Sequence, residues 1–157
     1  MSVPQRLKFF LQSNHIHYDT LPHSTTYTAQ GTAAIMQVSG REIAKTVVVR
    51  VGEQSEETIL AVLPGARHVK LDKLAAAVGK PVRLASELEF VDLFPDCELG
   101  AMPPFGNLYG LPVYVAASLT EEPEIAFNAG THTEVIQMAY ADFAELVKPI
   151  VLDFITT

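Results

Sequence analysis

The spacing of hydrophobic residues along the chain predicts a mixture of helices and strands. After Pro4, a residue typical of the first turn of a helix, apolar side chains recur at helical spacing up to Leu11. Residues 43–51 and 58–63 are rich in β-branched residues and flank a polar segment that contains a glycine, which predicts a β-hairpin. The strands do not alternate regularly with helices, so the pattern favours an α+β fold over a doubly wound one.

The remaining elements follow from the same periodicities and from capping residues. Helices are expected over residues 4–14, from Thr28 onward, over 71–78, from Ser86 to a stop at Pro95, and over 140–147. Strands are expected over residues 18–21, 43–51, 58–63, 113–115, 124–127 and 134–138. We therefore predict a single domain over residues 1–157, with a curved mixed or antiparallel sheet, barrel-like in outline, and flanking helices.

The size and the hydropathy of the chain restrict where the protein works. With 157 residues and a mass of 17.1 kDa, the chain is large enough for one domain with a hydrophobic core. No apolar run approaches the roughly 20 residues that a membrane helix needs. The residues after Met1 lack the apolar core of a signal peptide. A cytoplasmic protein without membrane contact is the resulting expectation.

The net charge of −7 is unevenly distributed. Residues 1–83 carry ten of the eleven Lys and Arg residues and have a balance of +4, whereas residues 84–157 have a balance of −11. An acidic protein is a poor candidate for wrapping long nucleic acid, because neutralisation of phosphates dominates such binding. The basic half is compatible with contacts to one or two phosphates, and equally with a solvated surface of mixed charge.

Well-known catalytic and metal-binding motifs are missing from the sequence. The single cysteine, Cys97, has no partner for a disulfide or a zinc site and is expected to be a structural thiol. His15, His17 and the distant His23 are too few for a metal site. The chain also lacks a nucleophile elbow, a phosphate-binding P-loop, a His-Glu-x-x-His motif and a dinucleotide fingerprint. We therefore expect neither a metal nor an organic cofactor.

Lys45 is the most conspicuous polar residue in a predicted strand. Residues alternate between the two faces of a strand, so Lys45 shares the more apolar face with Val47 and Val49. An ammonium group in that position extends to solvent from the beginning of the strand, pairs with a carboxylate or faces a pocket. If it faces a pocket, it is held ready for a phosphate or carbonyl oxygen.

Two glycine-containing segments are candidate ligand cradles, because glycine lets backbone groups approach a ligand closely. The first segment consists of Gly100, Ala101, Met102, Pro103, Pro104, Phe105 and Gly106, and the second consists of Asn128, Ala129, Gly130, Thr131 and His132. Phe105 either stacks on a base or ribose or packs in the core. His132 either orients a water or bonds to a hydroxyl, or is a surface histidine in a turn.

These residues together resemble the YbaK/EbsC family, which includes the editing domain of bacterial prolyl-tRNA synthetase and freestanding aminoacyl-tRNA deacylases. The family pattern of Gly, three residues, Pro, one residue and Gly corresponds to Gly100, Pro104 and Gly106, and its strand lysine corresponds to Lys45. The resemblance covers nearly the whole chain. It implies a compact domain with a curved mixed sheet and flanking helices.

The resemblance also implies an activity, namely hydrolysis of the ester between a wrong amino acid and the 3′-terminal ribose of tRNA. By this analogy Lys45 anchors the terminal phosphate or the carbonyl, and the backbone of residues 100–106 binds the aminoacyl end. In family accounts a neighbouring ribose hydroxyl helps to activate water, which would explain the absence of a catalytic triad. His132 is then a candidate catalytic residue, and Gly130 and Thr131 are candidates for binding the substrate.

Two other functions fit the same residues. A non-catalytic module that binds a tRNA end or an aminoacyl ligand would need the same cradle. A hydrolase of small free esters or amides would act without tRNA. In the main hypothesis the partner is the tRNA 3′ end, an aminoacyl-tRNA synthetase is a candidate second partner, and the protein is expected to be a monomer.

Overall fold

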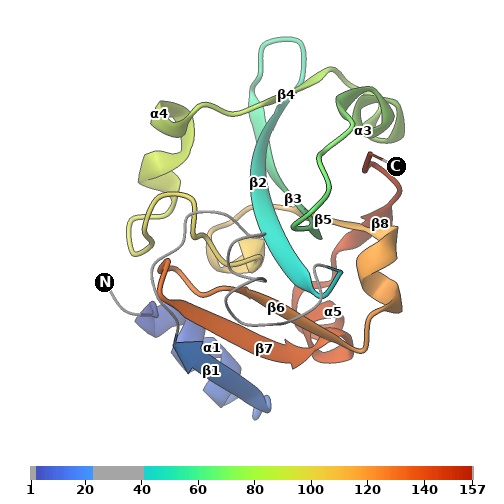
Figure 1. Ribbon diagram of the computed structural model, residues 1–157. Helices are drawn as coiled ribbons and strands as arrows, with labels where there is room; N and C mark the ends of the chain where they lie inside the picture. Colours follow the sequence, from blue (N-terminus) through green and yellow to red (C-terminus); the bar gives the residue numbers. More distant parts are fainter. Residues whose placement is uncertain (1–2, 23–40, 157) are drawn as a thin grey trace.

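The computed structural model describes residues 3–22 and 41–156, and Figure 1 shows how its helices lie around one curved sheet. The helices are α1 (Gln5–Ser13), α3 (Leu71–Val78), α4 (Glu87–Phe90) and α5 (Tyr140–Val147). Short 3-10 helices cover Val91–Leu93, Gly106–Leu108 and Ala117–Glu121. The strands are β1 (Tyr18–Pro22), β2 (Ile43–Val51), β3 (Glu57–Pro64), β4 (Val82–Leu84), β5 (Val113–Ala116), β6 (Glu124–Asn128), β7 (Glu134–Ala139) and β8 (Ile150–Leu152). The expected α+β domain with a mixed sheet is confirmed, and the helix expected from Thr28 lies outside the described residues.

Strand β2 is the centre of the sheet. The strand order is β1-β7-β6-β2-β3-β5-β8, with β4 also paired to β2. β2 runs antiparallel to β3 along its length, parallel to β6 only at Ile43 and Ala44, and antiparallel to β4 from Val49 to Val51. In the part of the chain that the structure describes, β1 and β8 end this order and do not pair with each other, so the curved sheet is open rather than a closed barrel.

Local sequence signals explain where the helices begin and end. α3 ends at Gly79, whose φ of +77° is the left-handed conformation that favours glycine at a helix C-terminus. α4 begins with the expected capping box between Ser86 and Glu89. This helix is only one turn long and continues as a 3-10 turn that ends before Pro95.

The two faces of the sheet pack against different elements. Ala44 and Val48 of β2 belong to a large apolar cluster that also contains Leu7 and Leu11 of α1 and Phe143 of α5. On the other face of β2, Val49 and Val51 pack in a second cluster with Leu74 of α3, and Ile43 packs against β6 and β7. Lys45 is four residues before Val49 in the strand and therefore belongs to the same face, opposite α1 and α5, as the sequence predicts.

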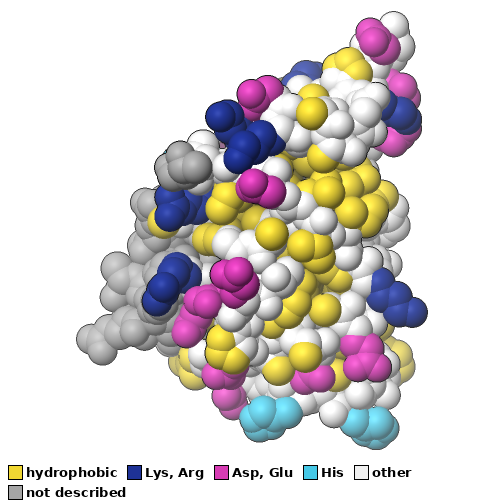
Figure 2. Space-filling view, turned by 90° about the vertical axis from the view of Figure 1, so that its right-hand side faces the viewer, with side chains coloured by type: hydrophobic (Ala, Val, Ile, Leu, Met, Phe, Trp, Pro, Cys, Tyr) yellow, Lys and Arg dark blue, Asp and Glu magenta, His cyan; other side chains and the backbone are white. Residues whose placement is uncertain are grey.

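The edge strand β8 exposes apolar side chains. Ile150 and Val151 are about half exposed, at 50% and 48%. Figure 2 shows a broad apolar band with few charges on the side of the molecule where α3 and β8 lie in Figure 1. This side is therefore a poor surface for a polyanion. None of the described helices has the length and apolar character needed to cross a membrane.

Candidate active site

The two predicted glycine segments lie side by side and are joined by main-chain hydrogen bonds. The Glu98 N–H donates to the Gly130 carbonyl at 2.8 Å, and the Gly130 N–H donates to the Ala101 carbonyl, also at 2.8 Å. Gly100 and Gly130 both have a φ of +84°, a conformation that residues with a side chain rarely adopt. The structure thus brings these two turns together, and their glycines are needed for the backbone path.

The His132 side chain contacts the Gly100 turn. Its side chain is only 3% exposed, and its Nε2 lies 2.7 Å from the Leu99 carbonyl. Because a carbonyl oxygen can only accept, Nε2 must carry the hydrogen and donate. A Cβ on Gly100 would lie 3.6 Å from His132 Cε1, so the imidazole packs directly against this glycine. His132 is therefore a buried residue and not a surface histidine, and its Nε2 is bound to the Leu99 carbonyl.

Thr131 is also committed to the turn. It is completely buried, and its Oγ1 lies 3.0 Å from Thr133 Oγ1. The Thr133 N–H donates to Thr131 Oγ1 at 3.3 Å, at the point where the chain enters β7. The Thr131 side chain therefore stabilises the turn. A ligand could contact Thr131 only through its main-chain groups.

Lys45 lies where β2 separates from β6. The last residue pair between the two strands is Ala44 with Phe127, and β4 pairs with β2 only from Val49 onward. β6 continues from Phe127 directly into the Gly130 turn, so Lys45 and this turn leave the same end of the parallel pair. The Lys45 side chain is half-buried, and its burial lowers the pKa of the ammonium group. Within residues 3–22 and 41–156 it has no hydrogen bond or ion pair.

Asn128 begins the second glycine segment, and the sequence reasoning gave its side chain no role. It is the last residue of β6, and strand alternation puts it on the same face as Ala126, which packs with Ile43. Lys45 and Asn128 are the next residues of β2 and β6 after the last pair, and strand alternation assigns both to the face of Ile43 and Ala126. Its Oδ1 is buried and has no hydrogen-bond partner among the described residues. A polar residue that ends an apolar strand just before a glycine turn was the available signal.

The second half of the 100–106 segment belongs to the core. Phe105 is fully buried, with its ring 5.5 Å from that of Phe143 and 5.6 Å from that of Phe127. Stacking on a base would require an exposed ring, so the packing alternative describes this residue. A Cβ on Gly106 would lie 2.5 Å from the Leu111 carbonyl oxygen, which explains the glycine by packing. Met102, Pro103 and Pro104 are likewise buried. Only Gly100 is exposed in this segment, and the buried residues behind it fix its position.

Cys97 has the properties of a structural thiol. It is half-buried next to the Gly130 turn, and burial is the main reason why its pKa rises to about 11. At neutral pH it is therefore a thiol and a poor nucleophile. Among the described residues, no group of three or more His, Cys, Asp and Glu side chains is arranged to hold a metal ion.

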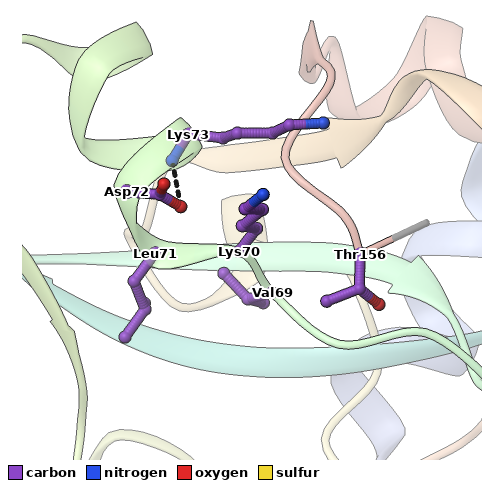
Figure 3. Close-up of a pocket in the computed structure, with 6 residues that line it drawn as sticks. All are labelled: Val69, Lys70, Leu71, Asp72, Lys73 and Thr156. Carbon is purple, nitrogen blue, oxygen red and sulfur yellow. Dashed lines mark hydrogen bonds between the residues drawn. The ribbon is translucent and has the colours of Figure 1, made fainter.

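A hollow of about 440 Å³ lies elsewhere, at the beginning of α3 (Figure 3). Figure 3 shows Lys70 and Lys73 on one side of this hollow and Thr156 on the other. The charges around it are balanced, since Asp72 is part of the lining and Lys73 Nζ lies 3.4 Å from Asp153 Oδ2. None of the predicted site residues lines this hollow, and we do not assign it to the reaction.

The fold is an α+β domain with a mixed sheet, and main-chain hydrogen bonds pair the two glycine turns of the candidate site. A profile described as an aminoacyl-tRNA editing domain matches residues 23–146. The chain belongs to this family, in agreement with the resemblance drawn from its motifs, and is an aminoacyl-tRNA editing or deacylase domain.

Known proteins similar to the chain agree with this assignment. It is 29% identical over 153 residues to the multifunctional Ser/Thr-tRNA deacylase ProXp-y of Escherichia coli strain K12, covering 96% of this chain and 91% of the relative. A crystal structure of a candidate trans-editing enzyme for prolyl tRNA synthetase superposes with a TM-score of 0.81 at 27% identity, covering 98% of this chain and 96% of that one. A hypothetical protein superposes with a TM-score of 0.86 at 22% identity, covering 97% and 100% of the two chains, which shows the fold alone.

Proposed function

We propose that the protein hydrolyses the ester that joins a mischarged amino acid to the 3′-terminal ribose of tRNA, without a metal or organic cofactor. The observation that carries this proposal is an editing-domain fold in which the half-buried Lys45 follows the last residue pair of β2 and β6, at the end where β6 continues through Asn128 into the paired glycine turns. Serine and threonine are the first amino acids to test, because the relative ProXp-y is named a Ser/Thr-tRNA deacylase.

The reaction needs only water as a second reactant. The water oxygen bonds to the ester carbonyl carbon while the carbonyl electron pair moves onto the carbonyl oxygen. When this intermediate collapses, the bond between the carbonyl carbon and the ribose oxygen breaks, and the ribose oxygen takes up a proton that the water has lost. The products are the free amino acid and tRNA with its terminal hydroxyl restored.

Lys45 supplies the positive charge in this scheme. Its ammonium donates to an oxygen that carries or acquires negative charge, either the ester carbonyl or the terminal phosphate. Asn128 has a buried side-chain acceptor with no hydrogen-bond partner among the described residues, which suits a hydroxyl or ammonium group of the substrate. Main-chain groups of the Gly100 and Gly130 turns complete the cradle.

The absence of a strong nucleophile is consistent with this chemistry. An aminoacyl ester is already activated, so holding water and carbonyl in a reactive geometry can supply much of the acceleration. Cys97 is protonated at neutral pH, and the Nε2 of His132 is occupied by Leu99. Cys97 is therefore a poor nucleophile, and the Nε2 contact of His132 shapes the Gly100 turn.

The test is a panel of tRNAs mischarged with serine, threonine, alanine or cysteine, assayed with the wild type, Lys45→Ala and the control Lys8→Ala. Lys8→Ala removes the same charge from a partly exposed position on α1. We expect release of at least one amino acid, loss of this activity in Lys45→Ala, and wild-type rates in Lys8→Ala and after treatment with EDTA. A lower kcat would assign Lys45 to the carbonyl, and a higher KM would assign it to the phosphate.

Two outcomes would replace the proposal. Tight binding of aminoacyl-tRNA without release of any amino acid would identify a binding module. Equal turnover of aminoacyl-tRNA and of small amino acid esters would identify a general esterase. Full activity of Lys45→Ala would remove this lysine from the mechanism.

A further inference from the structure

The beginning of α1 touches the candidate site. Pro4 directly precedes the helix and is buried, and Leu7 and Leu11 anchor the helix in the core. A Cβ on Gly130 would lie only 2.5 Å from Pro4 Cδ, so the proline ring packs tightly against this glycine. The N-terminal helix is therefore a direct neighbour of one of the two turns.

Arg6, two residues later, binds the segment that leads to the other turn. Its Nε donates to Asp96 Oδ2 at 2.6 Å, and its Nη1 donates to the Leu108 carbonyl at 3.1 Å. Its guanidinium carbon also lies 4.5 Å from the centre of the Tyr109 ring, at the distance of a cation–π contact. One side chain of α1 thus contacts both ends of the stretch from residue 96 to residue 109.

The residues that Arg6 contacts also bind one another. The Tyr109 hydroxyl donates to Asp96 Oδ1 at 2.9 Å, and Cys97 Sγ lies 3.3 Å from the same hydroxyl. Burial is the main reason why the pKa of Tyr109 is raised, so the phenol keeps its hydrogen and remains a donor. Both carboxylate oxygens of Asp96 are therefore used, one by Arg6 and one by Tyr109.

This cluster is directly continuous with the paired turns. Glu98, whose N–H donates to the Gly130 carbonyl, is two residues from Asp96 and adjacent to Cys97. Cys97 Sγ would lie 3.5 Å from a Cβ on Gly130. A displacement of residues 96–97 would therefore be passed on to the Gly100 turn and to its hydrogen bonds with Gly130.

We propose that Arg6 is a positioning residue of the site, which holds the Gly100 turn against the Gly130 turn through Asp96 and Tyr109. The role in catalysis rests on the proposed function, whereas the role in holding the turns does not. An isolated exposed ion pair contributes little, and the Arg6 and Asp96 side chains are 41% and 28% exposed. Here a planar guanidinium makes three different contacts at once. We expect its removal to let residues 96–109 move, with a smaller effect on the free energy of unfolding.

The single cysteine makes this proposal measurable. We would follow the rate at which dithiobis(nitrobenzoate) labels Cys97 in the folded wild type, Arg6→Ala, Arg6→Lys and the control Lys8→Ala, well below the unfolding temperature of each. Deacylation kinetics would be measured on the same samples. We expect faster labelling in Arg6→Ala by several-fold, wild-type labelling in Lys8→Ala, and an intermediate rate in Arg6→Lys, which retains the charge and loses the planar fork.

The kinetic expectation separates positioning from general stability. Small misplacement of reacting groups costs up to about 100-fold in rate, so Arg6→Ala should lower kcat by roughly 10- to 100-fold with KM within about twofold. A merely structural arginine would lower the unfolding temperature and leave both kcat and labelling of the folded protein unchanged, which would overturn the proposal. If Arg6→Ala fails to fold, Asp96→Asn tests the same contact with nearly the same shape.

An inactive wild type would refute the proposed function without ending this test. The labelling rates would then decide alone whether Arg6 holds the turn. Faster labelling would support the positioning role, and equal labelling in Arg6→Ala and Lys8→Ala would refute it.

Discussion

Gly100→Ala and Gly130→Ala are a matched pair of substitutions in the two turns of the candidate site. Both glycines have a φ of +84°, so the backbone penalty for a side chain is the same at the two positions. A left-handed conformation costs a residue with a Cβ roughly 1–2 kcal/mol. The gain from a less flexible unfolded chain is also the same for both and cancels in the comparison.

The two positions differ in the space that the new methyl group would meet. At Gly100 the nearest atom is His132 Cε1 at 3.6 Å, an ordinary contact, whereas at Gly130 it is Pro4 Cδ at 2.5 Å. Overpacking costs about 1–3 kcal/mol. We therefore expect Gly100→Ala to lose about 1–2 kcal/mol of unfolding free energy, and Gly130→Ala to lose about 1–3 kcal/mol more than that.

Urea unfolding of both variants measures this difference, and thermal unfolding should show it as about 2–4 °C per kcal/mol for a domain of this size. Pro4→Ala removes the two ring carbons nearest to Gly130, so the double variant Pro4→Ala/Gly130→Ala should recover part of the loss. Equal losses in the two single variants, or no recovery in the double variant, would refute the tight contact between α1 and the Gly130 turn.

Three further perturbations test the site and its support. Burial lowers the pKa of Lys45, so the unfolded chain binds this proton more tightly, and the stability of the fold rises as the pH increases through the lowered pKa. Lys45→Met should therefore raise the unfolding free energy at pH 7 and abolish deacylation. A less stable variant would contradict the buried environment of Lys45. For the same reason the deacylation rate, corrected for spontaneous hydrolysis, should decrease as the pH is raised, and the decrease should begin before pH 10.5 because Lys45 then loses its proton. An unchanged rate up to pH 10.5 would exclude the ammonium as the active form. The hydrogen bond from Arg83 is the first cause of the lowered pKa of Glu89, so its stabilising contribution should be lost as pH falls below 4.5; acid titrations of wild type and Glu89→Gln that ran parallel there would count against this pair. Phe105→Ala should cost about 3–5 kcal/mol in urea unfolding because the ring is in the core, and a loss confined to substrate binding would indicate stacking instead.

Much of the scaffold could be predicted from the sequence because its signals are local. β2, α3 and α5 have the predicted bounds, and each is specified by its own periodicity or by a terminal glycine or proline. The strands β4 and β8 were missed because three residues are too few for a periodic pattern. Their positions depend on pairing with β2 and β5, which a local pattern does not contain.

The site could be predicted only in its outline. Lys45 and the two glycine turns stood out because each breaks the pattern of the strand beside it. The sequence could not tell that Phe105 faces the core, since an aromatic residue after two prolines fits a loop equally well. The contacts of Arg6 with Asp96 and of His132 with Leu99 join residues 90 and 33 positions apart, and no spacing rule connects them.

His132 joins the two turns through a side-chain hydrogen bond to the Leu99 carbonyl, and two further hydrogen bonds between the turns join main-chain atoms alone. Such bonds do not depend on which side chains flank them, provided that the glycines remain. Residues around the rim of the cradle can therefore diverge between relatives without rebuilding the cradle itself. Evolution of a new amino acid preference on this scaffold would require exchange of a few lining side chains, while the main-chain frame of the proposed cradle stays the same.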